Sequence, residues 1–226
     1  MDKKFRVPRV WSNRELENFS HTFSGRAVNV SGWKDQDKEG RKYRDYFSNV
    51  SEYWITNYKS EARGFQGDQE NEIFLNLAED LDESMNGKFD VVFNHTVLEH
   101  IFEVGTAFTN LCNMSKDIVI LIVPFLQEQH ADYGDYWRFT PQAVDKLFSK
   151  NGFETLYISA NNSSDASIYV FCVASKLPHK WTCIRQQQDN MRDLIYKSEG
   201  MIGCNVIKST SFIGLAKNKL KYFFKK

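Results

Sequence analysis

The segment His130-Ala-Asp-Tyr-Gly-Asp-Tyr-Trp-Arg138 carries the densest set of groups in the chain that bind or transfer protons. A histidine titrates near neutral pH, so we expect His130 to act as a general base. Asp132 would orient His130 or serve as the base in its place. Tyr133, Tyr136 and Arg138 are expected to bind the substrate, because a guanidinium and phenol groups suit an anion or a sugar.

Two other interpretations of this segment stay open. Arg138 could instead form an internal ion pair with Asp132 or Asp135. The aromatic side chains and His130 could then serve to cap the core rather than to bind a substrate.

Two further histidines lie upstream, at His95 and His100. His95 follows an apolar run and could face a ligand, although a histidine at a strand end is often a hydrogen-bonded structural residue. His100 falls within the next predicted helix and is expected to be structural. The five-residue step between them misses the helical repeat that would align two ligands, so we expect no metal site formed with His130.

A buried strand and a helix must position these groups. The nearly continuous apolar run at 89–93 predicts a central strand covered on both faces. From Ile101 the apolar residues fall three or four apart, which indicates a helix. The polar turn between them lies at the carboxyl end of the strand, where open parallel sheets bind ligands. We therefore expect Asn94 and His95 to face a ligand.

The rest of the chain alternates between strand and helix patterns. Strands are predicted at 26–32, 52–58, 73–75, 117–124, 153–159 and 167–175. Helices are predicted at 13–19, 39–50 and 140–151, with a short or irregular helix within 59–72. Ser12 and Glu15 form a capping-box pattern for the first helix, which we expect to cover an edge of the fold. Thr140-Pro141 is a good helix start. The pattern indicates an α/β sandwich with a mixed sheet.

Two blocks resemble a known family. FDVVFNHTVLEHI at 89–101 is similar to the fourth-strand segment of class I S-adenosylmethionine-dependent methyltransferases. VPFLQEQHADYGDYWRFTPQAVDKLFSKNGF at 123–153 resembles a segment of methyltransferase-like proteins of bacterial surface-glycan synthesis. The resemblance implies a Rossmann-like sandwich, mostly parallel with an antiparallel terminal strand. It places the α/β domain at 26–176, between an N-terminal helical extension at 1–25 and a C-terminal helical, basic extension at 177–226.

The resemblance also implies an activity and a cofactor. The expected reaction is in-line methyl transfer from S-adenosylmethionine to an oxygen of a sugar or glycan precursor, with His130 as the base. The implied cofactor contacts are Ser31, Gly32, Asn57, Asn76, Leu77, Asn94 and His95. The segment VNVSGWKDQDKEG lacks the family's closely spaced glycines and its usual acidic residue. A non-catalytic methyltransferase-like binding module therefore stays as the alternative.

The amino-acid composition limits which binding partners and which cellular compartment we expect. Lys plus Arg equals Asp plus Glu at 29 each, so we expect no nucleic-acid partner. The four cysteines form no C-x-x-C pair, which favours free thiols in the cytoplasm over a zinc site. The last 24 residues contain six lysines interleaved with apolar residues and no acidic residue. This tail is expected either to contact the inner face of a membrane peripherally or to pack as a solvated helix.

Overall fold

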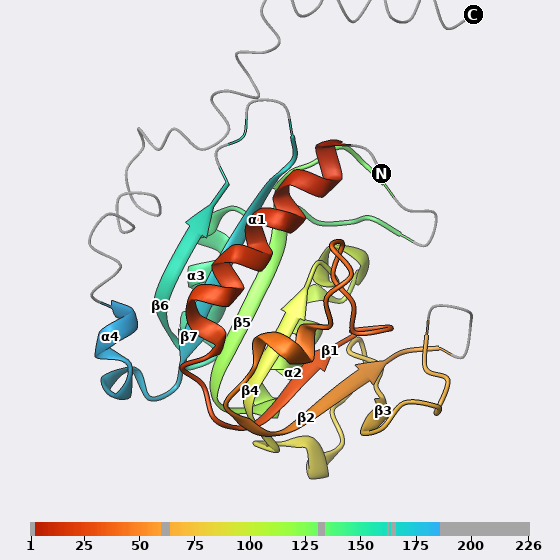
Figure 1. Cartoon of the computed structure of the whole chain (residues 1–226), viewed down its shortest axis with the longest axis vertical. Helices are drawn as coiled ribbons and strands as arrows, with labels where there is room; N and C mark the ends of the chain where they lie inside the picture. The colour runs from red at the N-terminus through yellow and green to blue at the C-terminus, as the bar shows by residue number, and fades with distance from the viewer. Residues whose placement is uncertain (1–2, 60–63, 131–133, 162, 164–165, 186–226) are drawn as a thin grey trace, which may run out of the picture.

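The computed structural model describes residues 3–59, 64–130, 134–161, 163 and 166–185. Its described part is built on a seven-stranded sheet in the order β3-β2-β1-β4-β5-β7-β6 (Figure 1). The strands are β1 (Gly25–Val30), β2 (Val50–Asn57), β3 (Glu72–Phe74), β4 (Phe89–His95), β5 (Ser115–Leu126), β6 (Glu154–Ala160) and β7 (Ile168–Ser175). Only β7 runs antiparallel to its neighbours β5 and β6. The predicted Rossmann-like, mostly parallel sheet is confirmed.

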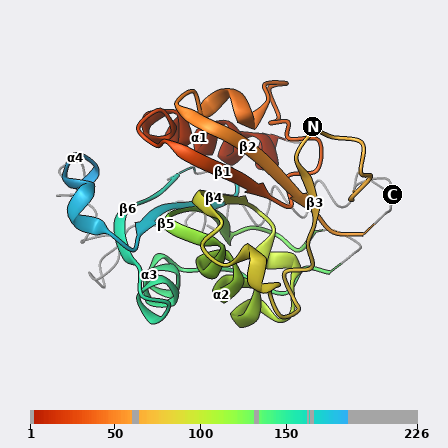
Figure 2. The ribbon, with the colours of Figure 1, turned by 90° about the horizontal axis from the view of Figure 1, so that it is seen from below.

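Helical elements cover both faces of this sheet (Figure 2). One face carries α2 (Val104–Met114) and α3 (Pro141–Lys150), where the rings of Phe108 and Phe148 lie 4.8 Å apart. The other face carries α1 (Lys3–Ser20) and the 3-10 helix η1 (Tyr43–Tyr46). There Phe19 of α1 packs 4.5 Å from the Tyr157 ring. Each face therefore has its own hydrophobic core.

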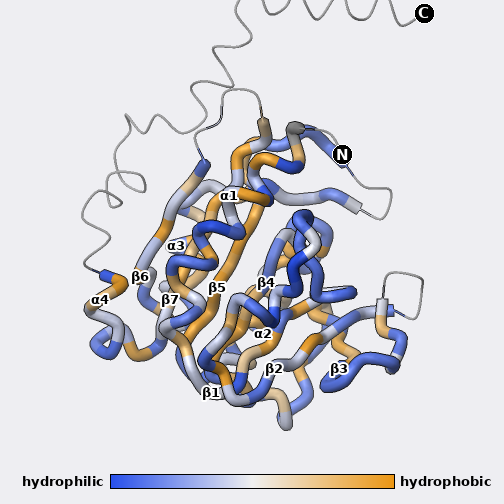
Figure 3. Tube along the Cα trace, viewed as in Figure 1, coloured by the Kyte–Doolittle hydropathy of each residue, from blue (hydrophilic) through white to orange (hydrophobic). Residues whose placement is uncertain are grey.

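The strands at the centre are the most apolar part of the chain. Residues 118–123 of β5 are at most 1% exposed, and the strand is hydrophobic along most of its length (Figure 3). Such a strand is stable when both of its faces are covered, and residues 118–123 contribute to the hydrophobic cores on the two faces of the sheet. The predicted start of α3 is also correct, because Thr140 Oγ1 accepts a hydrogen bond from the Ala143 amide (3.1 Å).

The N-terminal helix differs from its prediction in its start and in its position. It begins at Lys3, so Ser12 lies inside it and donates its hydroxyl to the Arg9 carbonyl instead of capping. Glu15 accepts hydrogen bonds from the hydroxyls of Tyr157 (2.7 Å) and Ser159 (2.9 Å) on β6. The helix consequently covers a face of the sheet and not its edge. The capping-box pattern was matched by chance, because both side chains make tertiary contacts.

The predicted helix at 39–50 is wrong, since only the short η1 forms there. Two buried carboxylates hold this connection instead. Asp35 accepts hydrogen bonds from the Tyr53 hydroxyl (2.7 Å) and the Asn29 amide (2.8 Å). Asp37 accepts from the Tyr46 hydroxyl (2.7 Å) and from two backbone amides. Aspartate oxygens that bind nearby amides compete with a helix for the same donors.

The remaining elements are short. They are the 3-10 helices η2 (Glu83–Met85), η3 (Leu98–His100) and η4 (Pro178–Lys180), and the helix α4 (Thr182–Arg185). The described part of the connection between β2 and β3, at 59 and 64–71, contains no helix. The basic tail at 203–226 lies outside the described residues. Within the described ranges, no helix combines the length and the apolar character that a bilayer span requires.

Candidate active site

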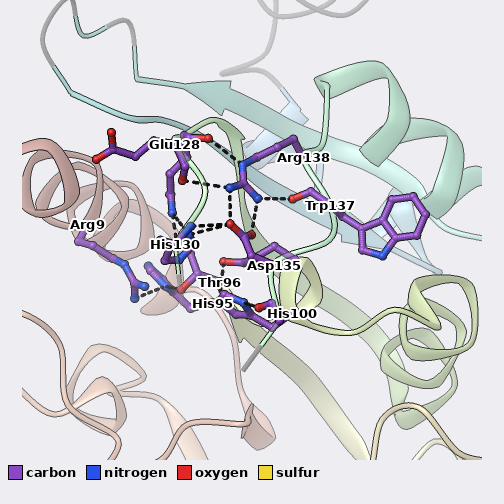
Figure 4. Close-up of polar contacts among 12 residues, drawn as sticks. Arg9, His95, Thr96, His100, Glu128, His130, Asp135, Trp137 and Arg138 are labelled. Atoms are coloured by element: carbon purple, nitrogen blue, oxygen red, sulfur yellow. Dashed lines mark hydrogen bonds and ion pairs between the residues drawn. The ribbon is translucent and has the colours of Figure 1, made fainter. Parts of the chain in front are cut away.

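Two loops meet at the carboxyl ends of β4 and β5. The Glu99 carbonyl in η3 accepts hydrogen bonds from the amides of Tyr136 (2.7 Å) and Trp137 (3.3 Å). The Nδ1–H of His100 donates to the Gly134 carbonyl (2.6 Å). Because β4 and β5 are parallel neighbours, the loops that follow them leave the same edge of the sheet (Figure 4). The structure thus brings the described part of the predicted segment, at 134–138, against η3.

A glycine shapes the second loop. Gly134 has φ +113°, and a Cβ there would lie 2.7 Å from the Tyr136 ring. The absence of a side chain lets Tyr136 fold back over the loop, with its ring 5.4 Å from the Phe102 ring. Phe102, Tyr136 and Trp137 form an exposed aromatic surface. Tyr136 is therefore placed where a substrate could contact it, whereas Tyr133 lies outside the described residues.

His130 is oriented by a carboxylate, although not by the predicted one. Asp135 Oδ2 lies 3.2 Å from His130 Nδ1 and accepts the His130 backbone amide (2.8 Å). Asp132, the predicted orienting residue, lies outside the described residues. The hydrogen bonds from Arg138 hold the pKa of Asp135 well below its usual value. Asp135 is consequently ionised, and its negative charge lies beside the His130 ring.

Arg138 has an internal role. Its Nη1 and Nη2 donate to the two carboxylate oxygens of Asp135 (2.5 and 2.7 Å). Its other three N–H groups donate to the carbonyls of Gln127, Glu128 and Trp137. All five donors are used, which leaves none for a substrate. The pairing with Asp135 is one of the two ion pairs left open by the sequence, so Arg138 positions the loop. A substrate contact of Arg138 stays a prediction.

His95 at the end of β4 points to α1. Arg9 Nη1 lies 3.2 Å from His95 Nδ1, and Ser12 Oγ lies 2.9 Å from Nε2. A guanidinium can only donate, so Nδ1 is the unprotonated nitrogen of a neutral ring. Burial lowers the pKa of His95 well below its usual value, and the charge of Arg9 adds to this shift. Both ring nitrogens contact α1, which favours the structural interpretation of His95. A cofactor contact of His95 stays a prediction.

Asn94 precedes His95 and is fully buried. Its Nδ2 donates to the Val30 carbonyl at the end of β1 (3.1 Å). Within the described part of the chain its Oδ1 has no hydrogen-bond partner. A buried acceptor without a donor is costly, so this position favours a ligand that donates.

Glu99 is the residue that the sequence analysis missed. Its side chain is 1% exposed, and both carboxylate oxygens lack hydrogen-bond partners among the described residues. Burial raises the pKa of Glu99 to about 7. The sequence did contain a signal for Glu99, because it is an ionisable residue that follows a buried strand and lies among apolar residues. Such a group is rarely buried without a function.

The loop after β1 uses its polar groups internally. The amides of Ser31 and Gly32 donate to the Thr56 side chain and carbonyl (both 3.2 Å). A Cβ at Gly32 would lie 2.6 Å from the Asn29 side chain, which is itself bonded to Asp35. Gly32 is therefore required for packing over Asn29. A cofactor contact of Ser31 or Gly32 stays a prediction.

At the end of β2, Asn57 is also engaged. Its Oδ1 accepts the Trp33 amide (2.7 Å), and its Nδ2 donates to the carbonyl of Trp33 (3.2 Å) and to Glu72 Oε1 (2.6 Å). A carboxylate therefore lies beside the end of β2, at Glu72 at the start of β3. A carboxylate has about four acceptor positions, so Glu72 can still accept from a ligand hydroxyl.

The turn after β3 contains the other two predicted contacts. Asn76 Oδ1 accepts the Ala78 amide (3.1 Å), and the Leu77 side chain is buried. Asn110 of α2 donates to the Leu77 carbonyl (2.9 Å). Only the backbone of Leu77 and the partly exposed Asn76 are available to a ligand.

Exposed aromatic side chains border the carboxyl ends of β1, β2 and β3. They are Trp33, Tyr58 and Phe74, which are between 38% and 52% exposed. The rings of Tyr58 and Phe74 lie 5.9 Å apart. Such faces offer stacking surfaces for a flat ring system.

Comparison with known proteins identifies the class of fold. No family model and no curated protein matches the sequence. Among solved structures, a provisionally assigned methyltransferase of Bacillus halodurans C-125 superposes with TM-score 0.54 and 9% identity, over 72% of this chain and 97% of that one. A chain from the Haloferax volcanii complex of the Trm112 methyltransferase activator with a provisionally assigned methyltransferase gives TM-score 0.55 and 11% identity, over 76% and 92%.

A third structure contains ligands. The 1,6-didemethyltoxoflavin-N1-methyltransferase of Burkholderia thailandensis, with bound 1,6-didemethyltoxoflavin and S-adenosylhomocysteine, gives TM-score 0.50 and 14% identity, over 76% of this chain and 83% of that one. The chain therefore has the class I methyltransferase fold. At these identities the likeness establishes the fold alone.

Proposed function

We propose that the protein is an S-adenosylmethionine-dependent methyltransferase that methylates an oxygen of a sugar or glycan precursor. The observation that carries the proposal is the pairing of His130 with the ionised Asp135 at the carboxyl end of β5, beside the exposed aromatic surface of Phe102, Tyr136 and Trp137. This arrangement lies on a fold whose solved relatives include a methyltransferase with bound S-adenosylhomocysteine.

The residues around β1, β2 and β4 fit this cofactor. Asn94 Oδ1 is a buried acceptor without a donor among the described residues, and the ammonium group of S-adenosylmethionine is a donor. Glu72, which contacts the predicted cofactor residue Asn57, offers acceptor capacity for ribose hydroxyls. Trp33, Tyr58 and Phe74 offer faces for the adenine ring. Of the seven predicted contacts, Asn94 is the one most directly supported.

The chain's own groups supply acid–base chemistry and orientation. When bound, S-adenosylmethionine supplies an electrophilic methyl group. His130 accepts the proton of the acceptor hydroxyl through Nε2, while the Asp135 carboxylate, 3.2 Å from Nδ1, stabilises the imidazolium that forms. The exposed rings of Phe102 and Tyr136 provide a platform for the apolar face of a sugar. The alignment of the acceptor oxygen with the methyl group, and the removal of water from the site, contribute the rest of the rate acceleration of methyl transfer.

Calorimetric titration with S-adenosylmethionine and S-adenosylhomocysteine tests the proposal. We expect saturable binding of both compounds. The His130→Ala variant should lose turnover by about 100-fold or more while its cofactor affinity stays within a few-fold, because general-base catalysis contributes about 10² to 10⁴. His179→Ala removes an exposed histidine outside the site and serves as the matched control. Equal losses in both variants, or a loss of affinity alone, would contradict the role of His130.

One observation favours a second function, a binding module without catalysis. The loop after β1 satisfies its polar groups with Thr56, Asn57 and Asn29, and no α-helix follows it before β2. A cofactor must therefore approach a loop that is already internally bonded. No heat and no thermal stabilisation at millimolar S-adenosylmethionine would support this module and remove the methyltransferase proposal.

A further inference from the structure

We propose that Glu99, His100 and His130 form a binding site for a divalent transition-metal ion. One ligand atom of each residue lies within 4.8 Å of the others. The residues come from η3 and from the loop after β5, so only the docking of these two segments creates the cluster. The site is distinct from the cofactor positions at β1 and β2, and its binding of metal does not depend on the proposed methyl transfer.

The buried carboxylate is the strongest indication. Both oxygens of Glu99 lack hydrogen-bond partners within the described residues, although the side chain is 1% exposed. The nearby Arg138 cannot relieve this, because its five N–H groups are used elsewhere. Arg9 directs Nη1 to His95. A cation held between Glu99 and the two imidazoles would give the carboxylate the partner that it lacks.

Both histidines are oriented as metal ligands usually are. A ligating imidazole normally donates its other ring N–H to a carbonyl or a carboxylate. His100 donates Nδ1–H to the Gly134 carbonyl (2.6 Å), and His130 Nδ1 lies 3.2 Å from the Asp135 carboxylate. These contacts direct Nε2 of each ring to the metal, so His130 cannot act as a general base while the ion is bound. Arg138 in turn forms an ion pair with Asp135, so the residue that orients His130 is itself held in place.

The distance between the Glu99 and His100 ligand atoms is close to that of a tetrahedral site, and all three ligand atoms lie within 4.8 Å of one another. Ligands about 2.0–2.2 Å from zinc lie about 3.3–3.6 Å from one another. Glu99 Oε1 is 3.7 Å from His100 Nε2, and the ring centroids of His100 and His130 are 5.1 Å apart. Small rotations of the side chains would complete the triad. The Gln127 amide contacts both nitrogens of His130 (2.7 and 3.0 Å), so metal binding must displace it from Nε2.

The ligand set selects the class of metal. Two imidazoles and one carboxylate suit zinc and its first-row neighbours, whereas calcium and magnesium prefer oxygen ligands alone. Three protein ligands leave a fourth position open for water or a substrate oxygen. No metal site was expected from the sequence, because His95 and His100 lie five residues apart. The fold turns His95 to α1 and supplies Glu99 in its place.

Calorimetric titration of the full, untagged, chelator-treated chain with Zn²⁺, in the absence of cofactor and acceptor, tests the site. We expect one ion per chain in wild type. Glu99→Gln keeps the size of the side chain, and His130→Ala removes a ligand on the surface loop. Each should weaken binding by at least about 10-fold, since even loss of a supporting residue costs about 10–100-fold. His179→Ala is the matched control and should bind as wild type does.

Co²⁺ absorption identifies the ligands. Bound Co²⁺ should show visible d–d bands without a thiolate charge-transfer band, which separates this site from the exposed Cys183. Thermal denaturation without metal shows whether each variant is folded. The proposal is overturned if wild type binds no ion, if Glu99→Gln and His130→Ala bind as tightly as wild type, or if a thiolate band accompanies binding.

Discussion

The guanidinium of Arg9 lies 3.2 Å from His95 Nδ1, which joins the N-terminal helix to the carboxyl end of the central strand. Ser12 completes the joint at Nε2 (2.9 Å). The contact requires a neutral imidazole, because a protonated Nδ1 cannot accept from a guanidinium. The attachment of α1 to β4 therefore depends on pH.

Because Arg9 and Ser12 contact a neutral His95, we expect the free energy of unfolding to decrease in mild acid. Burial depresses the pKa of His95 in the folded chain, whereas in the unfolded chain it is near 6.5. Below that pH the unfolded state binds a proton that the folded state does not. The free energy of unfolding should then fall with pH by up to about 1.4 kcal/mol per unit from this group. Urea denaturation at several pH values measures the slope.

His95→Gln should flatten that slope, although it lowers stability near neutral pH. His179→Gln, an exposed position, should leave the slope as in wild type. Parallel stability curves for wild type and His95→Gln would show that His95 is not the titrating group.

The contact of Glu15 with β6 should stabilise the packing of α1. Glu15→Ala leaves the hydroxyls of Tyr157 and Ser159 without their acceptor, so we expect a loss of about 1–3 kcal/mol in the free energy of unfolding. Glu17→Ala is the matched control on the same helix. Glu17 pairs with Arg41 at the surface, where such pairs contribute about 0–1 kcal/mol. Equal effects of the two variants in urea denaturation would contradict the docking role.

The glycine after β1 should be required for packing. Gly32→Ala would bring a Cβ to 2.6 Å from the Asn29 side chain, which cannot move without breaking its bond to Asp35. We expect a loss of about 1–3 kcal/mol, as for other overpacked sites. Gly105→Ala is the control, because no atom lies within 4 Å of its Cβ position in α2. That variant should be stabilised by about 0.5–1 kcal/mol. A neutral Gly32→Ala would refute the close approach.

The planar guanidinium of Arg138 should stabilise the conformation of the loop after β5 through its five hydrogen bonds. Lysine has three donors without a planar arrangement, so Arg138→Lys cannot replace the five hydrogen bonds. We expect the amides of Tyr136 and Trp137 to exchange hydrogen about 10-fold faster or more, because their hold on Glu99 loosens. Hydrogen exchange measured by mass spectrometry tests this. Arg14→Lys, at an exposed position of α1, should leave both amides protected.

The strands and the fold class followed from the sequence alone. Residues 118–123 and most of 89–93 are apolar in succession, and such runs are stable only as strands covered on both faces. The helix α3 was also predictable, because Thr140 and Pro141 act locally at its first turn. These patterns depend on neighbours in sequence.

The roles of the polar side chains were decided by the tertiary structure. Glu15 looked like a cap and bonds β6 instead, and His95 looked like a ligand contact and bonds α1. Glu99 acquired its position only when the loop after β5 docked on η3. A hydrogen bond depends on which partner comes within about 3 Å, and that partner is often many residues away in sequence. Sequence spacing therefore predicted where polar groups would gather, while the fold determined which of them are already satisfied.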